Sequence, residues 1–127
     1  MKNKYLLDTN IVIYFFNGLT DDATLIEILR SSFNISIITK IEFLSWQKLL
    51  NDPVLNDKAL EFISNARVFE LDEVVANRTI KNRQQFKIKT PDAIIGATAQ
   101  VHGFEIVTNN VDDFRVLDVK MTKVALK

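Results

Sequence analysis

Acidic side chains occur in several places where an apolar segment gives way to polar, helix-capping residues. Asp8 is the first of them, and it is the only charged residue within residues 5–16, YLLDTNIVIYFF. A carboxylate placed among hydrocarbon is costly unless something compensates its charge. The other acids in comparable positions are Glu42, Asp92, Asp112 and Asp113.

Carboxylates that converge on one place repel each other, and each raises the pKa of the others. A divalent cation removes this conflict, and Mg²⁺ or Mn²⁺ prefers such oxygen ligands. A cation held in this way can polarise a phosphodiester and hold an attacking water. The residue types therefore indicate metal-dependent phosphoryl chemistry, provided that the fold brings the acids together.

The elements that must position these acids can be read from apolar patterning and capping residues. Short apolar segments predict strands, and helical spacing between them predicts helices. The expected strands are 5–7, 34–38, 67–71 and 104–107, with 116–119 as a fifth strand at the edge. The expected helices cover about 22–30, 39–50, 53–66, 72–86 and 90–101, with a short turn at 110–114; residues 11–16 fit either a helix or a strand.

Alternation of strands and helices predicts an α/β fold with a parallel sheet and helices on both faces. Ligands of such folds bind beyond the carboxyl ends of the strands. Asp8 directly follows the first strand, and Asp112 and Asp113 follow the fourth. Glu42 is expected in the first turn of a helix capped by Thr39 after the second strand. These residues should therefore face one rim of the sheet.

Asp92 follows Thr90 and Pro91, an expected N-cap and first helical residue. It joins the same rim only if its helix points its N-terminus there, as a right-handed crossover into the fourth strand requires.

Each acid also has a simpler explanation. Thr39 and Glu42 form a capping-box pattern, which needs no catalysis. Asp92 could complement a helix dipole, as could Asp112 or Asp113 as solvated acids at a helix start. Asp8 could be a helix cap. Only the joint pattern favours a common site.

Composition limits the remaining classes. The chain has 127 residues, 16 basic and 16 acidic side chains and no cysteine. Disulfides, zinc–thiolate sites and cysteine nucleophiles are therefore excluded. Nucleic-acid binding would need a local basic patch, because no global basic field exists. The longest uncharged apolar run, residues 11–16, is too short to cross a bilayer. No signal-peptide layout is evident, so we expect a soluble, cytoplasmic protein without a membrane partner.

Four motifs in order along the chain resemble those of a PIN domain, and the VapC-type toxin ribonucleases of toxin–antitoxin systems are the closest match. The motifs are LLDTN at residues 6–10, TKIE at 39–42, TPDAIIGATA at 90–99 and VTNNVDDF at 107–114. The first and third are specific when found together. The resemblance covers essentially the whole chain and implies a single PIN-like domain over residues 1–127.

The resemblance implies a three-layer α/β/α sandwich around a parallel sheet of about four to five strands. It also implies an endoribonuclease that depends on Mg²⁺ or Mn²⁺. Asp8, Glu42 and Asp92 match the acidic triad of the family, with Asp8 and Asp92 as the main metal ligands. Asn10 and Thr108 match polar positions that shape the site.

This chain departs from many PIN domains at the fourth acidic position, where it has the amide Asn110. Asp113, in preference to Asp112, is expected to supply the fourth carboxylate. The implied reaction is in-line attack of a metal-activated water, which leaves a 5′-phosphate and a 3′-hydroxyl. It needs no histidine, and His102 is interpreted as a cation at the C-terminus of a helix.

Basic residues lead directly into the third motif. Residues 78–89 contain five basic side chains and no acid. Such a run is either a solvated helix face or a ridge that contacts phosphates. The expected RNA contacts are Lys40, Arg83, Lys87 and Lys89.

Residues 41–50 carry apolar side chains on nearly every face of the expected helix, including Trp46. This helix either packs between two others or offers a groove to a partner. The family resemblance implies a homodimer and a cognate antitoxin, which would place a basic side chain in the acidic site.

Three other classes fit less well. A receiver domain would have paired acids after the first strand and an acceptor Asp after the third. An Asp-nucleophile phosphatase would have Asp-x-Asp, but Asn10 occupies the second place. A non-catalytic PIN-like module for RNA or protein binding remains the main alternative, and metal-dependent cleavage would separate it from a nuclease.

Overall fold

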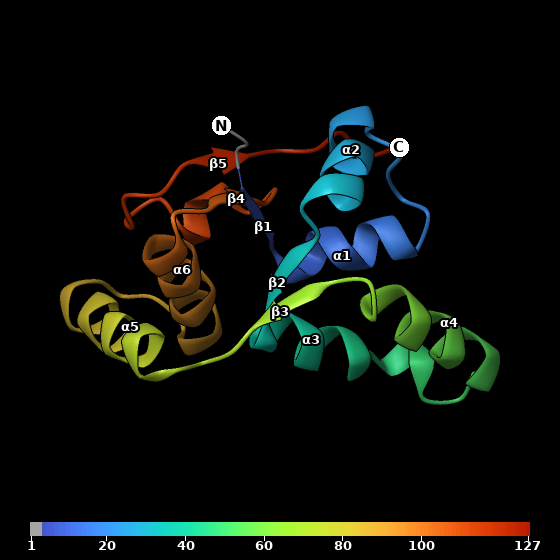
Figure 1. The fold of residues 1–127 in the computed structure, drawn as a ribbon, viewed down its shortest axis with the longest axis horizontal. Helices are drawn as coiled ribbons and strands as arrows, with labels where there is room; N and C mark the ends of the chain where they lie inside the picture. The colour runs from blue at the N-terminus through green and yellow to red at the C-terminus, as the bar shows by residue number, and fades with distance from the viewer. Residues whose placement is uncertain (1–3) are drawn as a thin grey trace.

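The computed structural model describes residues 4–127 and consists of short parallel strands covered by helices (Figure 1). The strands are β1 (Tyr5–Leu7), β2 (Asn34–Ser36), β3 (Arg67–Phe69), β4 (Glu105–Val107) and β5 (Met121–Thr122). The helices are α1 (Thr9–Phe16), α2 (Ala23–Ser31), α3 (Ile37–Leu44), α4 (Pro53–Ile63), α5 (Glu73–Gln85) and α6 (Thr90–His102). Two short 3₁₀ turns, η1 (Gln47–Leu49) and η2 (Val111–Asp113), complete the elements.

The strands form two parallel ladders in place of one continuous sheet. One ladder has the order β1–β4–β5, and the other pairs β2 with β3. Leu7 pairs with Val107, so the carboxyl ends of β1 and β4 lie side by side. The Asn34 side chain bridges the ladders by donating to the carbonyl oxygen of Tyr5 at 2.9 Å. The expected α/β fold with parallel strands is confirmed.

The position expected for the fifth strand is wrong, although a fifth strand at an edge does exist. Residues 116–119 run from the end of a turn into irregular chain, and β5 begins at Met121. Phe114 and Leu117 are fully buried against α6, where Gly96 leaves room for Leu117. This segment therefore packs its apolar side chains on a helix, and the chain returns to pair with β4 only afterwards.

The start of α3 also differs from the expected one. Ser36 is the N-cap, and its side chain accepts a hydrogen bond from the amide of Ile38. The second strand is consequently shorter than 34–38, Thr39 lies inside the helix, and Glu42 lies in its second turn. The capping-box explanation of Glu42 is therefore wrong. The helix ends at Leu44, well before residue 50, so Trp46 lies in the connection to η1.

The remaining helix boundaries are close to those expected. Four helices, α1, α2, α4 and α5, are capped by the side chain of an aspartate that precedes them. These aspartates are Asp8, Asp22, Asp52 and Asp72. Helix α4 ends at Ile63, three residues earlier than expected. Helix α6 begins at Thr90 itself, so Lys89 and not Thr90 occupies the N-cap. His102 is the last residue of α6, and Gly103 ends the helix with a left-handed φ of 71°.

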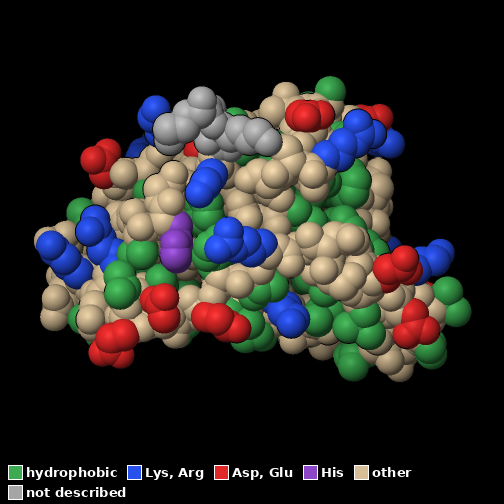
Figure 2. All heavy atoms as spheres, in the orientation of Figure 1, with side chains coloured by type: hydrophobic (Ala, Val, Ile, Leu, Met, Phe, Trp, Pro, Cys, Tyr) green, Lys and Arg blue, Asp and Glu red, His purple; other side chains and the backbone are tan. Residues whose placement is uncertain are grey.

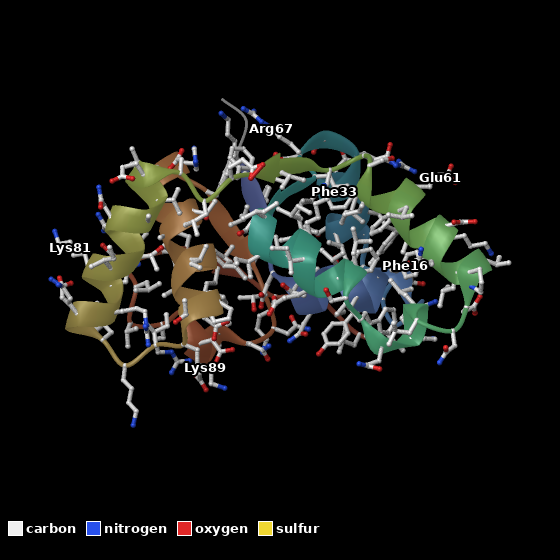
Figure 3. The ribbon with its side chains drawn as sticks, turned by 90° about the horizontal axis from the view of Figure 1, so that it is seen from below. Phe16, Phe33, Glu61, Arg67, Lys81 and Lys89 are labelled. Atoms are coloured by element: carbon white, nitrogen blue, oxygen red, sulfur yellow. The ribbon has the colours of Figure 1, made fainter. Side chains whose placement is uncertain are left out.

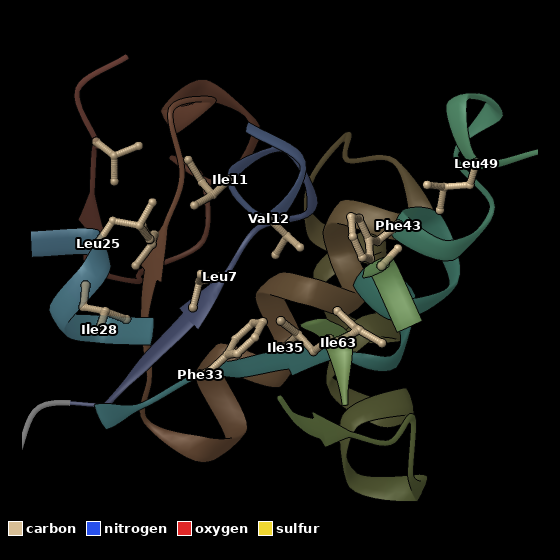
Figure 4. Packing of buried hydrophobic residues seen from close by; sticks show 13 residues of the cluster. Leu7, Ile11, Val12, Leu25, Ile28, Phe33, Ile35, Phe43, Leu49 and Ile63 are labelled. Carbon is tan, nitrogen blue, oxygen red and sulfur yellow. The ribbon is translucent and has the colours of Figure 1, made fainter. Parts of the chain in front are cut away.

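Two apolar cores lie on opposite faces of the β1–β4 ladder, because successive strand residues point to opposite sides. Leu7 and Val107 join the core with α1 to α4, part of which Figure 4 shows. Leu6 and Ile106 join the core under α6. Phe62 of α4 contacts the rings of Phe15, Phe16, Phe33 and Phe43. The expected layering of helices on both faces is confirmed.

Within residues 4–127, no helix is both long and apolar enough to cross a membrane.

Candidate active site

Asp8 lies at the carboxyl end of β1 and caps α1. Its residue is only 6% exposed. One carboxylate oxygen, Oδ1, accepts a hydrogen bond from the amide of Thr9 at 2.9 Å. The other, Oδ2, accepts one from the hydroxyl of Thr108 at 2.8 Å. Capping therefore accounts for one oxygen of Asp8, and Thr108 holds the other from a separate strand.

The electrostatic surroundings of Asp8 favour its neutral form. Burial is the main cause that raises the pKa of Asp8 above its ordinary value, while the hydrogen bonds from Thr108 and Thr9 lower it. The charges of Asp113 and Glu42 raise this pKa further. Those two acids, which belong to other elements, thus lie close enough to Asp8 to affect it.

Glu42 reaches the same place from α3. Its Oε1 accepts a hydrogen bond from the hydroxyl of Thr9 at 2.6 Å. Since Thr9 directly follows Asp8 in the chain, this bond brings the Glu42 carboxylate to the start of α1. Glu42 is solvent-exposed, so it lies at the open side of the arrangement.

Asp92 lies in the first turn of α6, as expected. Partial burial and the charges of Asp113, Asp8 and Glu42 raise the pKa of Asp92 to about 6, and the nearby Lys89 lowers it. A residue that only complemented a helix dipole would not sense three other carboxylates. The N-terminus of α6 therefore points to the rim that carries Asp8, which is the orientation that the crossover argument requires.

The structure separates Asp113 from Asp112. Asp113 is among the charges that raise the pKa of both Asp8 and Asp92. Asp112 pairs with Arg115 at 2.8 Å on the exposed surface. Asp113 is therefore the better candidate for the fourth carboxylate.

The polar residues expected to shape the site have unequal support. The Thr108 hydroxyl, besides donating to Asp8, accepts a hydrogen bond from the amide of Asn110 at 2.9 Å. This bond fixes the start of the η2 turn that carries Asp113. Asn10 and Asn110 are both partly exposed. For Asn10, only its place one residue after Thr9 supports a role in the site.

The four acids come from four separate parts of the chain, namely the junction of β1 with α1, then α3, α6 and η2. Their charges act on one another, which is the arrangement that a divalent cation would stabilise. Among residues 4–127, no three His, Cys, Asp or Glu side chains already stand close enough together to hold a metal ion. The donor set suits Mg²⁺ or Mn²⁺ in oxygen type and charge, but the carboxylates would have to draw closer around it.

The expected RNA-binding residues Lys40, Arg83, Lys87 and Lys89 are all solvent-exposed. Lys89 adjoins the acids, because it lowers the pKa of Asp92. Arg83 is tied down through Nε, which donates to the carbonyl oxygen of Ile88 at 3.2 Å. Figure 3 shows Lys89 near the start of α6, whereas Lys81 extends from the outer side of α5. Basic and acidic side chains are interspersed on the face seen in Figure 2, consistent with a formal net charge of zero.

Trp46 lines a groove of about 330 Å³ with Leu44, Leu49, Leu50 and Pro53. The Nζ atom of Lys48 lies 5.4 Å from the centre of the Trp46 ring. The expected apolar helix over 41–50 is replaced by α3 and η1, and the groove lies where they meet α4. Trp46 is therefore not part of a helix, and it is partly buried against the core while it lines this groove.

Sequence reasoning assigned no role in the site to the hydroxyls of Thr9 and Thr39. The structure places them 3.0 Å apart, next to Glu42. Thr9 lies next to Asp8 in the first motif, and Thr39 lies in the same motif as Glu42. This closeness in sequence to two candidate acids was the signal that could have indicated a role for the two hydroxyls.

Comparison with known proteins agrees with the geometry. No curated protein matches the chain by sequence. A solved toxin–antitoxin complex from Klebsiella pneumoniae contains a chain with 32% sequence identity and a TM-score of 0.77, over 93% of this chain and 96% of that one. A DNA-bound VapBC from Salmonella typhimurium gives 25% identity and a TM-score of 0.81, over 96% and 98% of the two chains.

A VapBC complex from Rickettsia felis, bound to a promoter DNA fragment, contains a chain with 20% sequence identity and a TM-score of 0.82. The match covers 96% of this chain and 99% of that one, and at this identity it shows a likeness of fold alone. The match to the PIN domain family itself extends over residues 5–120. With this match over most of its length, the chain belongs to the PIN domain family.

Proposed function

We propose that this PIN domain is a metal-dependent endoribonuclease and the toxin of a toxin–antitoxin pair. The observation that carries the proposal is the meeting of acids from separate parts of the chain. Thr9 contacts both Asp8 and Glu42, and burial together with the charges of Asp113, Asp8 and Glu42 raises the pKa of Asp92 to about 6. Perturbed carboxylates that face each other at strand ends are typical of sites that bind a cation or move a proton.

Asp8, Asp92 and Glu42 would hold the cation, with Asp113 as the fourth carboxylate. Mg²⁺ or Mn²⁺ would supply positive charge that polarises a phosphodiester and favours hydroxide at neutral pH. The protein's own part is to aim these oxygens: Thr108 and the amide of Thr9 hold Asp8, and the hydroxyl of Thr9 holds Glu42. Water that attacks in line, with the 3′-oxygen leaving, gives a 5′-phosphate and a 3′-hydroxyl.

Lys89 is the basic residue best placed to contact the substrate. It is exposed and acts electrostatically on Asp92, so it can meet a phosphate beside the acids. Lys40, Arg83 and Lys87 would add weaker contacts. Affinity that depends on such contacts falls steeply with salt.

We further propose a cognate antitoxin and a homodimer, acting in the cytoplasm as a single domain over residues 1–127. The toxin–antitoxin complex of the Klebsiella relative supports an antitoxin. The groove around Trp46 offers an apolar seat for a partner side chain, and aromatic residues are frequent anchors in protein interfaces.

The first test is cleavage of a mixed RNA pool by purified protein, with Mg²⁺ or Mn²⁺ and with EDTA. The matched variants are Asp92→Asn and Asp57→Asn, because Asp57 is an exposed acid on α4 outside the site. We expect cleavage that needs metal, disappears in Asp92→Asn and persists in Asp57→Asn. Equal activity in all three proteins would indicate a contaminating ribonuclease.

The second candidate is a non-catalytic module for RNA or protein binding. It is favoured by the absence, among the described residues, of three acids already spaced for a metal. A wild-type protein that neither cleaves RNA nor binds Mn²⁺ in calorimetry would support this candidate.

A further inference from the structure

Two buried threonine hydroxyls connect α1 with α3 directly beside Glu42. Thr9 is 8% exposed and Thr39 is fully buried. Their Oγ1 atoms lie 3.0 Å apart, and the Thr9 hydroxyl lies 2.6 Å from Oε1 of Glu42. Buried hydroxyls must find their hydrogen-bond partners inside the protein, so the positions of these two side chains are constrained by the contacts that they make.

Counting protons fixes the direction of the chain of hydrogen bonds. A hydroxyl has one proton to donate. The proton of Thr9 goes to Glu42, because a carboxylate is acceptor only. Thr39 must then donate its proton to Oγ1 of Thr9. The order is therefore Thr39 to Thr9 to Glu42, and each bond strengthens the next by polarisation.

Thr9 also contacts the other acid of this rim. Its amide donates to Oδ1 of Asp8 at 2.9 Å, while its hydroxyl holds Oε1 of Glu42. One residue thus fixes two carboxylates that belong to different elements.

We propose that Thr9 is a positioning residue, supported by Thr39, that holds the Glu42 carboxylate beside Asp8 so that both can contribute to one cation site. This inference rests on the proposed function for its use of the cation. It adds that the hydroxyl of Thr9, and not only the acids, sets the affinity for the metal. Partners that orient metal ligands typically contribute 10- to 100-fold in affinity.

The test compares Thr9→Val, Thr9→Ser, Thr39→Val and Glu42→Gln with the wild-type protein. Valine removes the hydroxyl and keeps the shape, while serine keeps the hydroxyl. Thr24→Val is the control, because Thr24 is an exposed threonine on α2. The measurements are the dissociation constant of Mn²⁺ by calorimetry, and kcat and KM for RNA cleavage.

We expect Thr9→Val to weaken Mn²⁺ binding at least about tenfold and to lower kcat more than it changes KM. Thr39→Val should have a smaller effect in the same direction, and Thr9→Ser should retain most of the affinity. The double variant Thr9→Val/Glu42→Gln should bind Mn²⁺ no more weakly than Glu42→Gln alone. Additive losses in the double variant, or unchanged affinity in Thr9→Val, would overturn the proposal.

A second readout separates this inference from the proposed function. Urea unfolding of the metal-free proteins forms a double-mutant cycle between Thr9→Val and Glu42→Gln. A coupling between the two residues, together with no Mn²⁺ binding by the wild-type protein, would retain the hydroxyl contact but reject both the nuclease and the metal-positioning role. No coupling in the cycle would reject the contact itself, even if the wild-type protein cleaves RNA.

Discussion

The hydroxyl of Thr108 donates to Oδ2 of Asp8 at 2.8 Å, although the two residues lie 100 positions apart in the chain. This contact is possible because β1 and β4 are parallel neighbours and both end at the same rim. It gives Asp8 a fixed orientation and is the strongest of the influences that lower its pKa.

Replacing Thr108 by Val should therefore raise the pKa of Asp8 further. The buried carboxylate would lose its donor, and the free energy of unfolding at neutral pH should fall by about 1–3 kcal/mol. Carbon NMR of labelled aspartate carboxyl groups measures the pKa, and urea unfolding measures the stability. Thr108→Ser keeps the hydroxyl and should change both quantities little. A Thr108→Val protein with the wild-type pKa at Asp8 would contradict the contact.

The pKa of Asp92 predicts how stability of the metal-free protein depends on pH. Its value of about 6 lies above the ordinary 3.8, so the folded protein binds the proton more tightly than the unfolded chain does. The stabilisation from protonated Asp92 is full below about pH 4 and is lost as the pH rises through 6. Asp92→Asn should therefore flatten the stability curve between these values and stabilise the metal-free protein at pH 7.

Thermal unfolding at several pH values in EDTA measures this effect. A slope between pH 4 and 6 that is the same in wild-type and Asp92→Asn proteins would count against the assigned pKa. Added Mn²⁺ should reverse the order at pH 7, because the cation stabilises the wild-type acids and has one ligand fewer in the variant.

Asp113 and Asp112 form a matched pair for testing the fourth carboxylate. Asp113→Asn should lower the pKa of Asp92, because Asp113 is the largest of the charges that raise it. Asp112→Asn should leave that pKa unchanged, since Asp112 faces Arg115. In the cleavage assay, Asp113→Asn should lose more activity than Asp112→Asn. A larger effect of Asp112→Asn would assign the fourth position to the other acid.

Lys89 and Lys81 provide a similar pair for RNA binding. Both are exposed lysines, but only Lys89 adjoins Asp92, and the two point to different sides of the molecule (Figure 3). Lys89→Ala should weaken RNA binding and reduce its salt dependence, whereas Lys81→Ala should change neither. Filter binding of RNA to the Asp92→Asn protein at several salt concentrations measures both effects without cleavage.

Gly96 is a close-approach position in the middle of α6. A Cβ at this residue would clash with Cδ1 of Leu117, a side chain that is only 1% exposed. Gly96→Ala should therefore destabilise the protein by about 1–3 kcal/mol in urea unfolding, because the buried leucine has little room to move. Adding Leu117→Ala should remove the clash, so the double variant should lose less than the sum of the two single variants.

The sequence predicted the fold well where local and tertiary signals agree. Asp72 caps α5 and Gly103 ends α6 as expected, because no other nearby residue competes for those roles. The start of α3 was missed because Ser36 and Thr39 are both good caps, and the isoleucines between them favour a strand. Tertiary packing decides between the two caps, and one sequence does not contain that information.

The candidate site shows the same limit. The parallel sheet predicted that Asp8, Glu42 and an acid after the fourth strand would face one rim, and Asp92 joined them only on the condition of a right-handed crossover. Which oxygen each hydroxyl holds depends on side-chain positions across elements, and so does the difference between Asp112 and Asp113. The role of Thr9 was hidden for this reason, since its neighbours Asp8 and Asn10 carried the more familiar pattern.

The division of the strands into two ladders makes the site a junction between two halves of the protein. Asp8 and the loop with Asp113 belong to the β1–β4–β5 half, while Glu42 extends from the β2–β3 half. Across this boundary the described strands of residues 4–127 are linked by side chains such as Asn34 and not by a backbone ladder. Within residues 4–127, no strand pairing therefore fixes Glu42 relative to Asp8, and the hydroxyl contact between Thr9 and Glu42 is a direct link between the two halves at the site.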